Sequence, residues 1–437
     1  MIGKISWNRL LRGLSEPAGH WIGRPRQAGT AYSASLILKL CHSLLSSHGE
    51  ATGMALAEEI LAGWVSLDEA GRRAVMQGLL IQFGPDLTKL EAAIAAHRVE
   101  PTAENVQRLH EASEPRRQKL IRRLNLARHG TVTLVDMRSQ LLEFKKDDVT
   151  LEVVDADFLH LFSSWFNRGF LVLRSIEWTT PANVLEKIIR YEAVHEIKGW
   201  RDLRQRLEPE DRRCFAFFHP QLPDEPLIFV EVALTKEIPA SVNALLLDQR
   251  ETVPADEAST AVFYSISNCQ TGLKGVSFGS FLIKQVVEEL RRELPNLKVF
   301  ATLSPVVGLA GWLQKKGQTF HNDTALGGDT DVLRAAALDY FFSARARDGR
   351  HVDPVARFHL GNGARLERIL LGADNSENGL RQSFGVMVNY LYKLDEIVAN
   401  HEAYVQRGEV VASPQLVRSW HAHRPLDAAK RLKSRQA

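Results

Sequence analysis

The chain has 437 residues, of which 45% are hydrophobic and 24% are charged, a composition typical of a globular protein with two or three domains. Its 55 Lys and Arg residues nearly balance 52 Asp and Glu residues, and the formal net charge of +3 argues against a nucleic-acid surface across the fold. No apolar run approaches the ~20 residues that cross a bilayer, and Cys41, Cys214 and Cys269 are too dispersed for a disulfide framework. We therefore expect a cytoplasmic protein that binds neither nucleic acid nor membrane.

The first third of the chain carries a helical pattern. Residues 1–30 are basic, which is typical of a frayed terminus and, less often, of an organelle-targeting segment. From about 30 to 165, segments such as "GMALAEEILAGWV" and "EAGRRAVMQGLLIQF" place apolar residues at spacings of three and four. No repeat of fixed period is present. This pattern predicts a helical bundle as an N-terminal domain over residues 1–165.

Strand patterns begin after residue 165. They occur in "GFLVLRSIEW", "RCFAFFH", "LIFVEVAL", "TAVFYSIS", "LKVFATLS" and "FGVMVNYLYKL", which alternate with helical segments such as "PANVLEKIIRYEAV". The segment "PQLPDEP" at 220–226 indicates a hairpin loop between two strands. Residues 166–437 are therefore predicted to form a mixed α/β domain around one central sheet, with a basic C-terminal tail, and the whole chain is α+β.

A polar turn poor in side chains, "KGVSFGS" at 274–280, lies between the strand candidate "AVFYSIS" and a helix over 280–294. The first turn of a helix presents unpaired N–H groups and the positive end of its dipole, so this order suits an anion site. The turn is neither a P-loop nor GxGxxG. A plain strand–helix connection explains the bare pattern at least as well.

The turn resembles the pyrophosphate-binding motif of GNAT-type acyltransferases, Gln/Arg-x-x-Gly-x-Gly/Ala, as Lys274-x-x-Ser277-x-Gly279, with Lys and Ser replacing two motif residues. Four segments together closely resemble malonyl-CoA decarboxylases and occur in that family's order. They are "FYSISNCQTGLKGVSFGSFLIKQVVEEL", "ATLSPVVGLAGWL", "FHLGNGARLERI" and "GVMVNYLYKLDEI". The resemblance covers roughly residues 165 to 400. It implies a GNAT-like domain after the helical domain, and conversion of malonyl-CoA to acetyl-CoA and carbon dioxide.

The resemblance also implies roles for particular residues. Ser304 matches the active-site serine of the family's "LSP" segment, and His359 matches the catalytic histidine of its "FHL-x-NGA" segment. Without the resemblance, Ser304 is more typical of a cap or turn, and His359 of an ordinary surface or core histidine. The residues that would bind the pyrophosphate of coenzyme A are Lys274, Gly275, Val276, Ser277, Phe278, Gly279 and Ser280.

The expected chemistry needs no cofactor, since coenzyme A enters as part of the substrate. Loss of carbon dioxide leaves a thioester enolate, which the thioester itself stabilises. The protein must hold the carboxylate, stabilise the enolate oxygen and supply a proton. The sequence contains neither HExxH nor clustered Cys and His, which agrees with a reaction without metal.

Other polar residues are weaker candidates. Tyr390 alternates with apolar residues, so it is either strand packing or a contact to the substrate. His219 ends a strand before Pro220 and is most simply structural. Cys269 would need a neighbouring histidine to act as a nucleophile.

Two other functions use the same loop: N-acyl transfer from coenzyme A to an amine, and coenzyme A binding without catalysis. Release of carbon dioxide from malonyl-CoA distinguishes decarboxylation from both. The resemblance further implies a homotetramer built as a dimer of dimers, with the helical domain as an oligomerisation interface.

Overall fold

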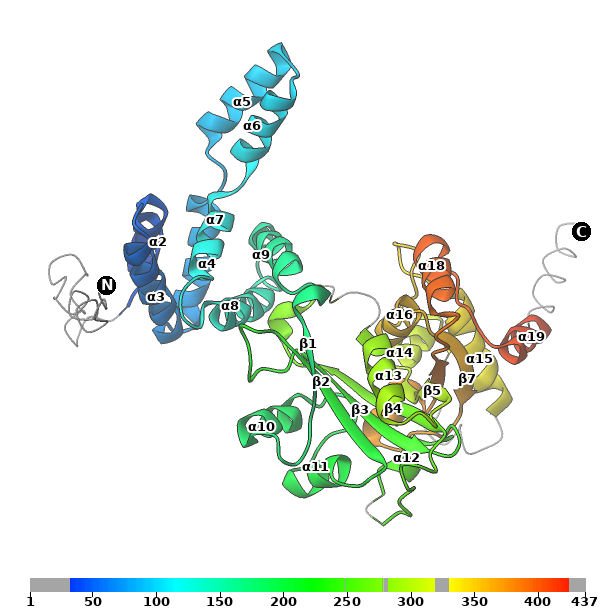
Figure 1. Cartoon of the computed structure of the whole chain (residues 1–437). Helices are drawn as coiled ribbons and strands as arrows, with labels where there is room; N and C mark the ends of the chain where they lie inside the picture. The colour runs from blue at the N-terminus through cyan, green and yellow to red at the C-terminus, as the bar shows by residue number, and fades with distance from the viewer. Residues whose placement is uncertain (1–31, 248, 277, 279–281, 319–329, 424–437) are drawn as a thin grey trace, which may run out of the picture. The chain divides into compact units, whose positions relative to one another are not determined.

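The structure is a computed structural model, and it describes residues 32–247, 249–276, 278, 282–318 and 330–423 (Figure 1). The chain divides into two compact units. Among the described residues, the helical unit comprises 32–165 together with 271–276, and the sheet unit comprises the others from 166 to 423. Within the described ranges, no helix is both long and apolar enough to cross a membrane.

The helical unit confirms the helix pattern read from the sequence. Its elements are α2 (Ala34–Ser46), α3 (Glu50–Ser66), α4 (Glu69–Gln82), α5 (Leu87–Val99), α6 (Ala103–Ser113), α7 (Arg116–Leu124), α8 (Gly130–Phe144), η1 (Val149–Leu151), α9 (Glu152–Trp165) and η3 (Thr271–Leu273). Side chains of Ser33, Asp68, Asp86 and Thr102 cap four of these helices by accepting main-chain N–H bonds. Helices α5 and α6 form a hairpin that stands away from the other helices of this unit (Figure 1).

A buried ion pair joins η3 to the rest of the helical unit. Arg138 on α8 donates to Asp155 on α9 at 2.8 Å and to the carbonyl of Gly272 at 2.7 Å. Lys145 also donates to Asp155, at 2.8 Å. A Cβ atom at Gly272 would lie 1.9 Å from the carbonyl oxygen of Val135, so only glycine fits where η3 meets α8. Residues 271–276 therefore pack with helices that lie far earlier in the chain.

The sheet unit is built on one mixed sheet. In its described residues the sheet has eight strands in the order β1-β2-β3-β4-β5-β8-β6, with β7 pairing β8. These are β1 (Val172–Ser175), β2 (Arg212–Phe218), β3 (Ile228–Thr235), β4 (Thr260–Asn268), β5 (Val299–Thr302), β6 (Ser304–Pro305), β7 (Arg365–Leu370) and β8 (Met387–Leu391). Strands β2 and β3 are antiparallel, which confirms the hairpin loop at 220–226. Among the named strands of the described residues, β4 and β5 form the one parallel pair.

Alternating side chains give the sheet two apolar faces. Phe215 and Phe217 of β2 belong to the larger core cluster, whereas Cys214 and Ala216 belong to a second cluster. Helices α13 (Leu282–Glu293), α14 (Leu309–Lys315), α15 (Thr330–Ser343) and α16 (Pro354–Gly361) contribute to the larger cluster, as do α18 (Ile397–Arg407) and α19 (Pro414–His423). Helices α10 (Ala182–Tyr191) and α11 (Trp200–Leu207) cover the other face. The remaining elements are η2 (Arg168–Phe170), α12 (Val242–Leu245) and α17 (Glu377–Ser383).

The expected fold class is confirmed: helices come first and a mixed α/β sheet domain follows. Helix α13 buries Leu282, Ile283, Val286, Val287 and Leu290, the five residues whose spacing predicts its apolar face.

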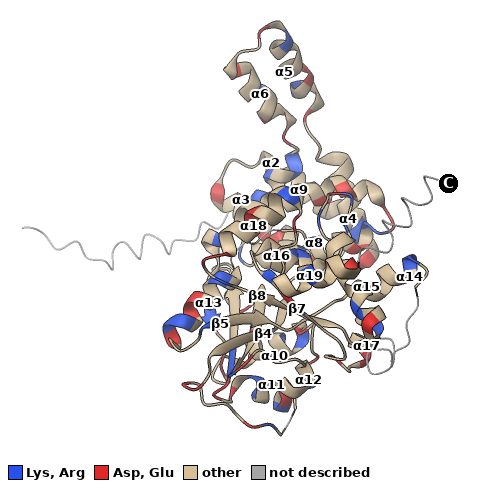
Figure 2. Ribbon diagram, turned by 90° about the vertical axis from the view of Figure 1, so that its right-hand side faces the viewer, with Lys and Arg blue, Asp and Glu red and all other residues tan. Residues whose placement is uncertain are grey.

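The near balance of charge is also visible along the chain. Basic and acidic residues are intermixed along the ribbon in Figure 2.

Candidate active site

Ser304 lies where the strand β5 breaks and continues as β6. The run Val299–Thr302 pairs with β4, Leu303 interrupts it, and Ser304 then pairs with Val388 of β8. The Ser304 side chain is buried, with 5% of its surface exposed. This interruption turns the hydroxyl toward the face of the sheet that α16 covers.

His359 lies in the last turn of α16. The helix starts cleanly because Asp353 caps it and Pro354 occupies its first position. His359 is 3% exposed, and its Nε2 atom lies 3.1 Å from Oγ of Ser304. The structure thus brings together the two residues that the sequence resemblance singles out, although they lie 55 positions apart.

The pair belongs to a longer hydrogen-bond chain. Ser304 donates to Oγ1 of Thr302 at 2.8 Å, so its own oxygen accepts from Nε2–H of His359. The Nδ1 atom of His359 then accepts from the phenol of Tyr392, at 2.8 Å. The order is Tyr392, His359, Ser304, Thr302. Sequence analysis missed Tyr392, and no local pattern around "NYLYKL" distinguishes it from Tyr390.

Tyr390 contacts the histidine in a different way. Its ring is stacked on that of His359, with centroids 4.6 Å apart and an interplanar angle of 23°. Tyr390 is 1% exposed, and its main-chain N–H donates to Thr302 at 3.1 Å. Tyr390 therefore packs against one face of the imidazole ring.

Burial determines the charge of this site. It lowers the pKa of His359 to about 3 and raises the pKa of Tyr392 and Tyr390 well above that of a free phenol. All three groups are neutral near pH 7. A neutral imidazole with one donor and one acceptor nitrogen is suited to passing a proton along the hydrogen-bond chain.

The predicted pyrophosphate loop is described in part. Lys274 and Gly275 are exposed, Val276 is buried, and Gly275 has a φ of +84°, which favours glycine. The N–H groups of Lys274 and Val276 bond within the turn, to the carbonyls of Thr271 and Leu273. Phe278 is half-buried against the larger core cluster of the sheet unit. Ser277, Gly279 and Ser280 lie outside the described residues.

The remaining sequence candidates are structural in character. The ring of His219 lies tilted against that of Phe166, and its Nδ1 atom accepts from the N–H of Gln221. Cys269 is buried, and its thiol donates to the carbonyl of Ser267. Burial raises the pKa of Cys269 well above that of a free thiol, which opposes a nucleophilic role.

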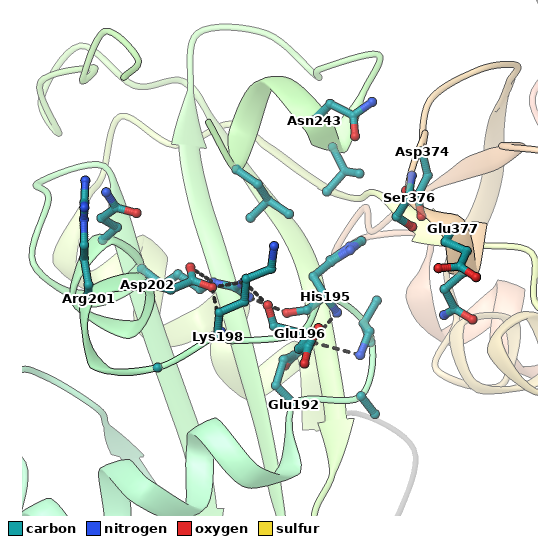
Figure 3. Close-up of a pocket in the computed structure, with 18 of the residues that line it drawn as sticks. Glu192, His195, Glu196, Lys198, Arg201, Asp202, Asn243, Asp374, Ser376 and Glu377 are labelled. Carbon is teal, nitrogen blue, oxygen red and sulfur yellow. Dashed lines mark hydrogen bonds and ion pairs between the residues drawn. The ribbon is translucent and has the colours of Figure 1, made fainter. Parts of the chain in front are cut away.

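A polar pocket of about 1220 Å³ lies on the opposite face of the sheet, beside α11 (Figure 3). His195 lines it, is 7% exposed, and has no hydrogen-bond partner for Nε2 among the described residues. Glu192 shapes the turn before His195 by accepting its N–H at 2.7 Å. Lys198, Asp202 and Glu377 bring both signs of charge to the walls. The sequence pattern did not indicate this pocket.

Comparison with known proteins identifies related chains along most of the sequence. The family model for the malonyl-CoA decarboxylase C-terminal domain matches residues 169–335 and 328–430. The model for the malonyl-CoA decarboxylase N-terminal domain matches residues 83–166.

Individual relatives agree with the family models. Mitochondrial malonyl-CoA decarboxylase of Anser anser anser is 32% identical over 415 residues, covering 82% of this chain and 82% of the relative. The crystal structure of malonyl-CoA decarboxylase from Rhodopseudomonas palustris is 52% identical with a TM-score of 0.84, covering 88% of this chain and 99% of that one. The corresponding structure from Agrobacterium vitis is 54% identical with a TM-score of 0.83 and the same coverage.

The buried histidine predicts a pH dependence of stability. His359 has a pKa of about 3 in the folded protein, against roughly 6.5 when unfolded. Between these values the unfolded chain binds a proton that the folded chain does not, so stability falls as the pH is lowered. At pH 5 this costs roughly 2 kcal/mol relative to pH 7 and above.

The test is urea unfolding of the wild type and of His359→Asn at pH 7, 6 and 5. We expect the free energy of unfolding to fall less between pH 7 and pH 5 in the variant, by about that amount. The variant must be compared with the wild type because burial also raises the pKa of Glu231 to about 8. That shift makes the folded protein more stable as the pH falls, opposite to the effect of His359. Equal falls in both proteins would contradict a buried neutral His359.

Proposed function

The chain belongs to the malonyl-CoA decarboxylase family, and we propose that it converts malonyl-CoA to acetyl-CoA and carbon dioxide at the Ser304–His359 pair. Membership of this family makes it a carboxy-lyase. The observation that carries the proposed site is the 3.1 Å contact between Oγ of Ser304 and Nε2 of His359, buried beneath α16. Ser304 and His359 stand in the two segments, "LSP" and "FHLGNGA", that resemble the family's catalytic segments.

The substrate changes the charge balance of the buried site. The free enzyme holds His359 neutral, because burial disfavours the imidazolium. A malonyl carboxylate beside the ring favours the imidazolium instead. We propose that His359 takes up one proton as the substrate binds. Tyr392 rotates its hydroxyl from donating to Nδ1 to accepting from it.

Decarboxylation then proceeds without a covalent intermediate. The bond between the carboxyl carbon and C2 breaks, and its electron pair passes into the thioester enolate. Ser304 gives its proton to C2 and recovers one from Nε2 of His359, which becomes neutral again. One proton is consumed per turnover, and both residues return to their starting states. Ser304 acts as a donor, since the reaction needs no acyl transfer.

Coenzyme A is proposed to bind through the 274–280 loop and the first turn of α13. The N–H groups of Lys274 and Val276 are used within the turn, so the donors available to a pyrophosphate come from Gly275 and from the start of α13. Lys274 is exposed and can add charge. Tyr390 is proposed to contribute to substrate binding indirectly, because its ring is stacked on that of His359.

Strand β4 supports a place for the pantetheine arm. Its parallel pairing with β5 covers Thr260 to Phe263, and β4 then continues to Asn268. A register shift opposite Glu231 and Val232 marks a bulge in β4 at this point. Pantetheine is an extended chain with amide groups, and such a chain suits the edge of β4 beyond the point where β5 stops pairing with it.

The decisive test is carbon dioxide release from malonyl-CoA by the wild type and by His359→Asn. Positioned proton transfer contributes ~10²–10⁴-fold to rate, so we expect kcat to fall by about that factor with little change in KM. His110→Asn, on the exposed surface of α6, is the matched control and should keep wild-type kcat. Activity should survive dialysis against a chelator, because the proposed chemistry uses no cofactor.

Several outcomes of this assay would contradict the proposal. Wild-type turnover by a folded His359→Asn variant would remove His359 from the chemistry. Acyl transfer to an amine without carbon dioxide release would favour an N-acyltransferase. Binding of malonyl-CoA without turnover would favour a coenzyme A-binding protein.

The loop assignment predicts a selective loss of coenzyme A affinity in Gly275→Val. Valine disfavours the φ of +84° at this position, so the loop must change its path. Gly317→Val is the matched control, because Gly317 has a φ of +72° and open space around it. Calorimetry should show weaker coenzyme A binding for Gly275→Val and wild-type binding for Gly317→Val. Equal affinities would remove the loop from the site.

A homotetramer, built as a dimer of dimers, is proposed as the assembly. Among the described residues, large apolar side chains are exposed on the helical unit at Met54, Val65, Ile81, Leu87, Val99, Val106, Leu126, Val149 and Val153. Helix α5 buries only Ala93 and α6 only Asn105, so this hairpin has apolar surface available for a second copy.

Sedimentation should give about four times the chain mass of 49.0 kDa. The double variant Leu87→Glu/Val99→Glu should lower that mass, because charge opposes burial of the hairpin. A monomeric wild type, or a variant that keeps the full mass, would contradict this interface. A cytoplasmic location and a role in fatty acid metabolism are also proposed; cell fractionation tests the former, since the animal relatives are named mitochondrial.

A further inference from the structure

We infer that Asp353 is a positioning residue that sets the distance between Ser304 and His359, by tying the loop after Ser304 to the helix that carries His359. This inference rests on the proposed function, because it concerns how that catalytic pair is held. Asp353 touches neither Ser304 nor His359. It acts on both through the main chain.

The two oxygens of Asp353 serve different elements. Oδ1 accepts the N–H groups of Val355 at 2.9 Å and Ala356 at 3.0 Å, at the start of α16. Oδ2 accepts the N–H of Gly308 at 3.1 Å and the phenol of Tyr340 at 3.1 Å. One carboxylate therefore connects α16 to Gly308 and to α15.

These connections act over short lengths of chain. Gly308 follows Ser304 by four residues and begins α14 as its cap. Asp353 precedes His359 by six residues and is the N-cap of α16, the helix that carries His359. A shift of Gly308 relative to α16 would therefore be transmitted to the contact between Oγ of Ser304 and Nε2 of His359. Hydrogen-bond geometry fails within a few tenths of an ångström, so such a shift would interrupt the proton path.

Packing around Gly308 shows how closely these elements approach. A Cβ atom at Gly308 would lie 2.3 Å from the hydroxyl of Tyr340, nearer than any real contact, and 3.5 Å from Oδ2 of Asp353. Gly308 has a φ of −101°, so its backbone does not itself require glycine. The small residue is needed for space, and space is limited by the same phenol that bonds Asp353.

Asp353 is itself fixed from a second side. Its N–H donates to Nδ1 of His351 at 2.9 Å, and Nε2 of His351 contacts the carbonyl of Tyr340 at 3.0 Å. Asp353 is 1% exposed and His351 is 0% exposed. Burial raises the pKa of Asp353, and its four hydrogen bonds oppose that rise. The carboxylate thus has all its strong acceptor directions used and little freedom to move.

An ordinary helix cap explains only half of this arrangement. Capping needs one oxygen and the first N–H groups of the helix, which Oδ1 supplies. The bonds of Oδ2 to Gly308 and Tyr340 add nothing to the helix. The bond to Gly308 joins α16 to the segment that follows Ser304, and the bond to Tyr340 joins it to α15, which is the property expected of a positioning group.

The first test is Asp353→Asn. The amide oxygen can still cap α16, but the amide nitrogen cannot accept the N–H of Gly308. Because misplacement by about 1 Å can cost ~10²-fold in rate, we expect kcat to fall about 10- to 100-fold, with KM for malonyl-CoA within about twofold. Asp68→Asn is the matched control. Asp68 caps α4 through Gly71 at 2.8 Å, and this variant should keep wild-type kcat.

The second test leaves Asp353 unchanged. Gly308→Ala should lower kcat in the same way, since the new methyl group collides with the hydroxyl of Tyr340. Adding Tyr340→Phe removes that hydroxyl and leaves the nearest ring carbon at 3.5 Å, an ordinary contact. The double variant should therefore recover most of the lost kcat, although it carries one more mutation. A purely structural role predicts instead that Gly308→Ala loses stability while its folded fraction keeps wild-type kcat.

The outcomes separate this inference from the function it rests on. If folded Asp353→Asn keeps wild-type kcat, or if Tyr340→Phe fails to rescue Gly308→Ala, Asp353 does not position the pair. If His359→Asn itself retains full activity, the proposed site is wrong instead. If Asp353→Asn does not fold, the Gly308 and Tyr340 variants still decide the question.

Discussion

The catalytic arrangement depends on the position of β8 beside the broken strand β5–β6. Tyr392 donates its N–H to the carbonyl of Phe300 at 2.8 Å, Asn389 donates to the carbonyl of Thr302 at 2.7 Å, and Ser304 pairs with Val388. Strand β8 thus pairs with Ser304, and Tyr392, which directly follows β8, bonds His359. The hydrogen-bond chain is short because Tyr392 at one end and Thr302 at the other are both held where β8 bonds to the β5–β6 segment.

Burial gives this arrangement its chemical character. A buried His359 with a pKa of about 3 is neutral before the substrate arrives, so the site carries no charge that must be neutralised in the empty state. In the proposed mechanism, the anionic carboxylate of the substrate is the group that makes protonation of the ring favourable. When carbon dioxide leaves, the negative charge passes to the enolate, which is a stronger base than the carboxylate and therefore takes up the proton.

Sequence patterns predicted what is local and missed what is assembled from distant parts. The apolar spacing of α13, the hairpin at 220–226 and the order of helices and strands are local properties, and the structure agrees with them. Ser304 and His359 could be selected only by resemblance, because one serine at a strand end and one of 15 histidines have no distinguishing neighbours in sequence. Tyr392 and Asp353 bond groups 33 and 45 residues away, and no periodicity encodes such contacts.

The segment 271–276 illustrates the same limit. These residues follow β4 in the chain, yet they pack with helices of the first 165 residues. Arg138 donates to the carbonyl of Gly272, and the carboxylate of Asp155, which also accepts from Lys145, neutralises that buried guanidinium. Removing Asp155 would leave Arg138 as an unpaired buried charge, which costs about 3–5 kcal/mol and would release η3 from α8. Lys274 and Gly275 directly follow η3 in the chain, so the helices that hold η3 also constrain the backbone from which these two residues start.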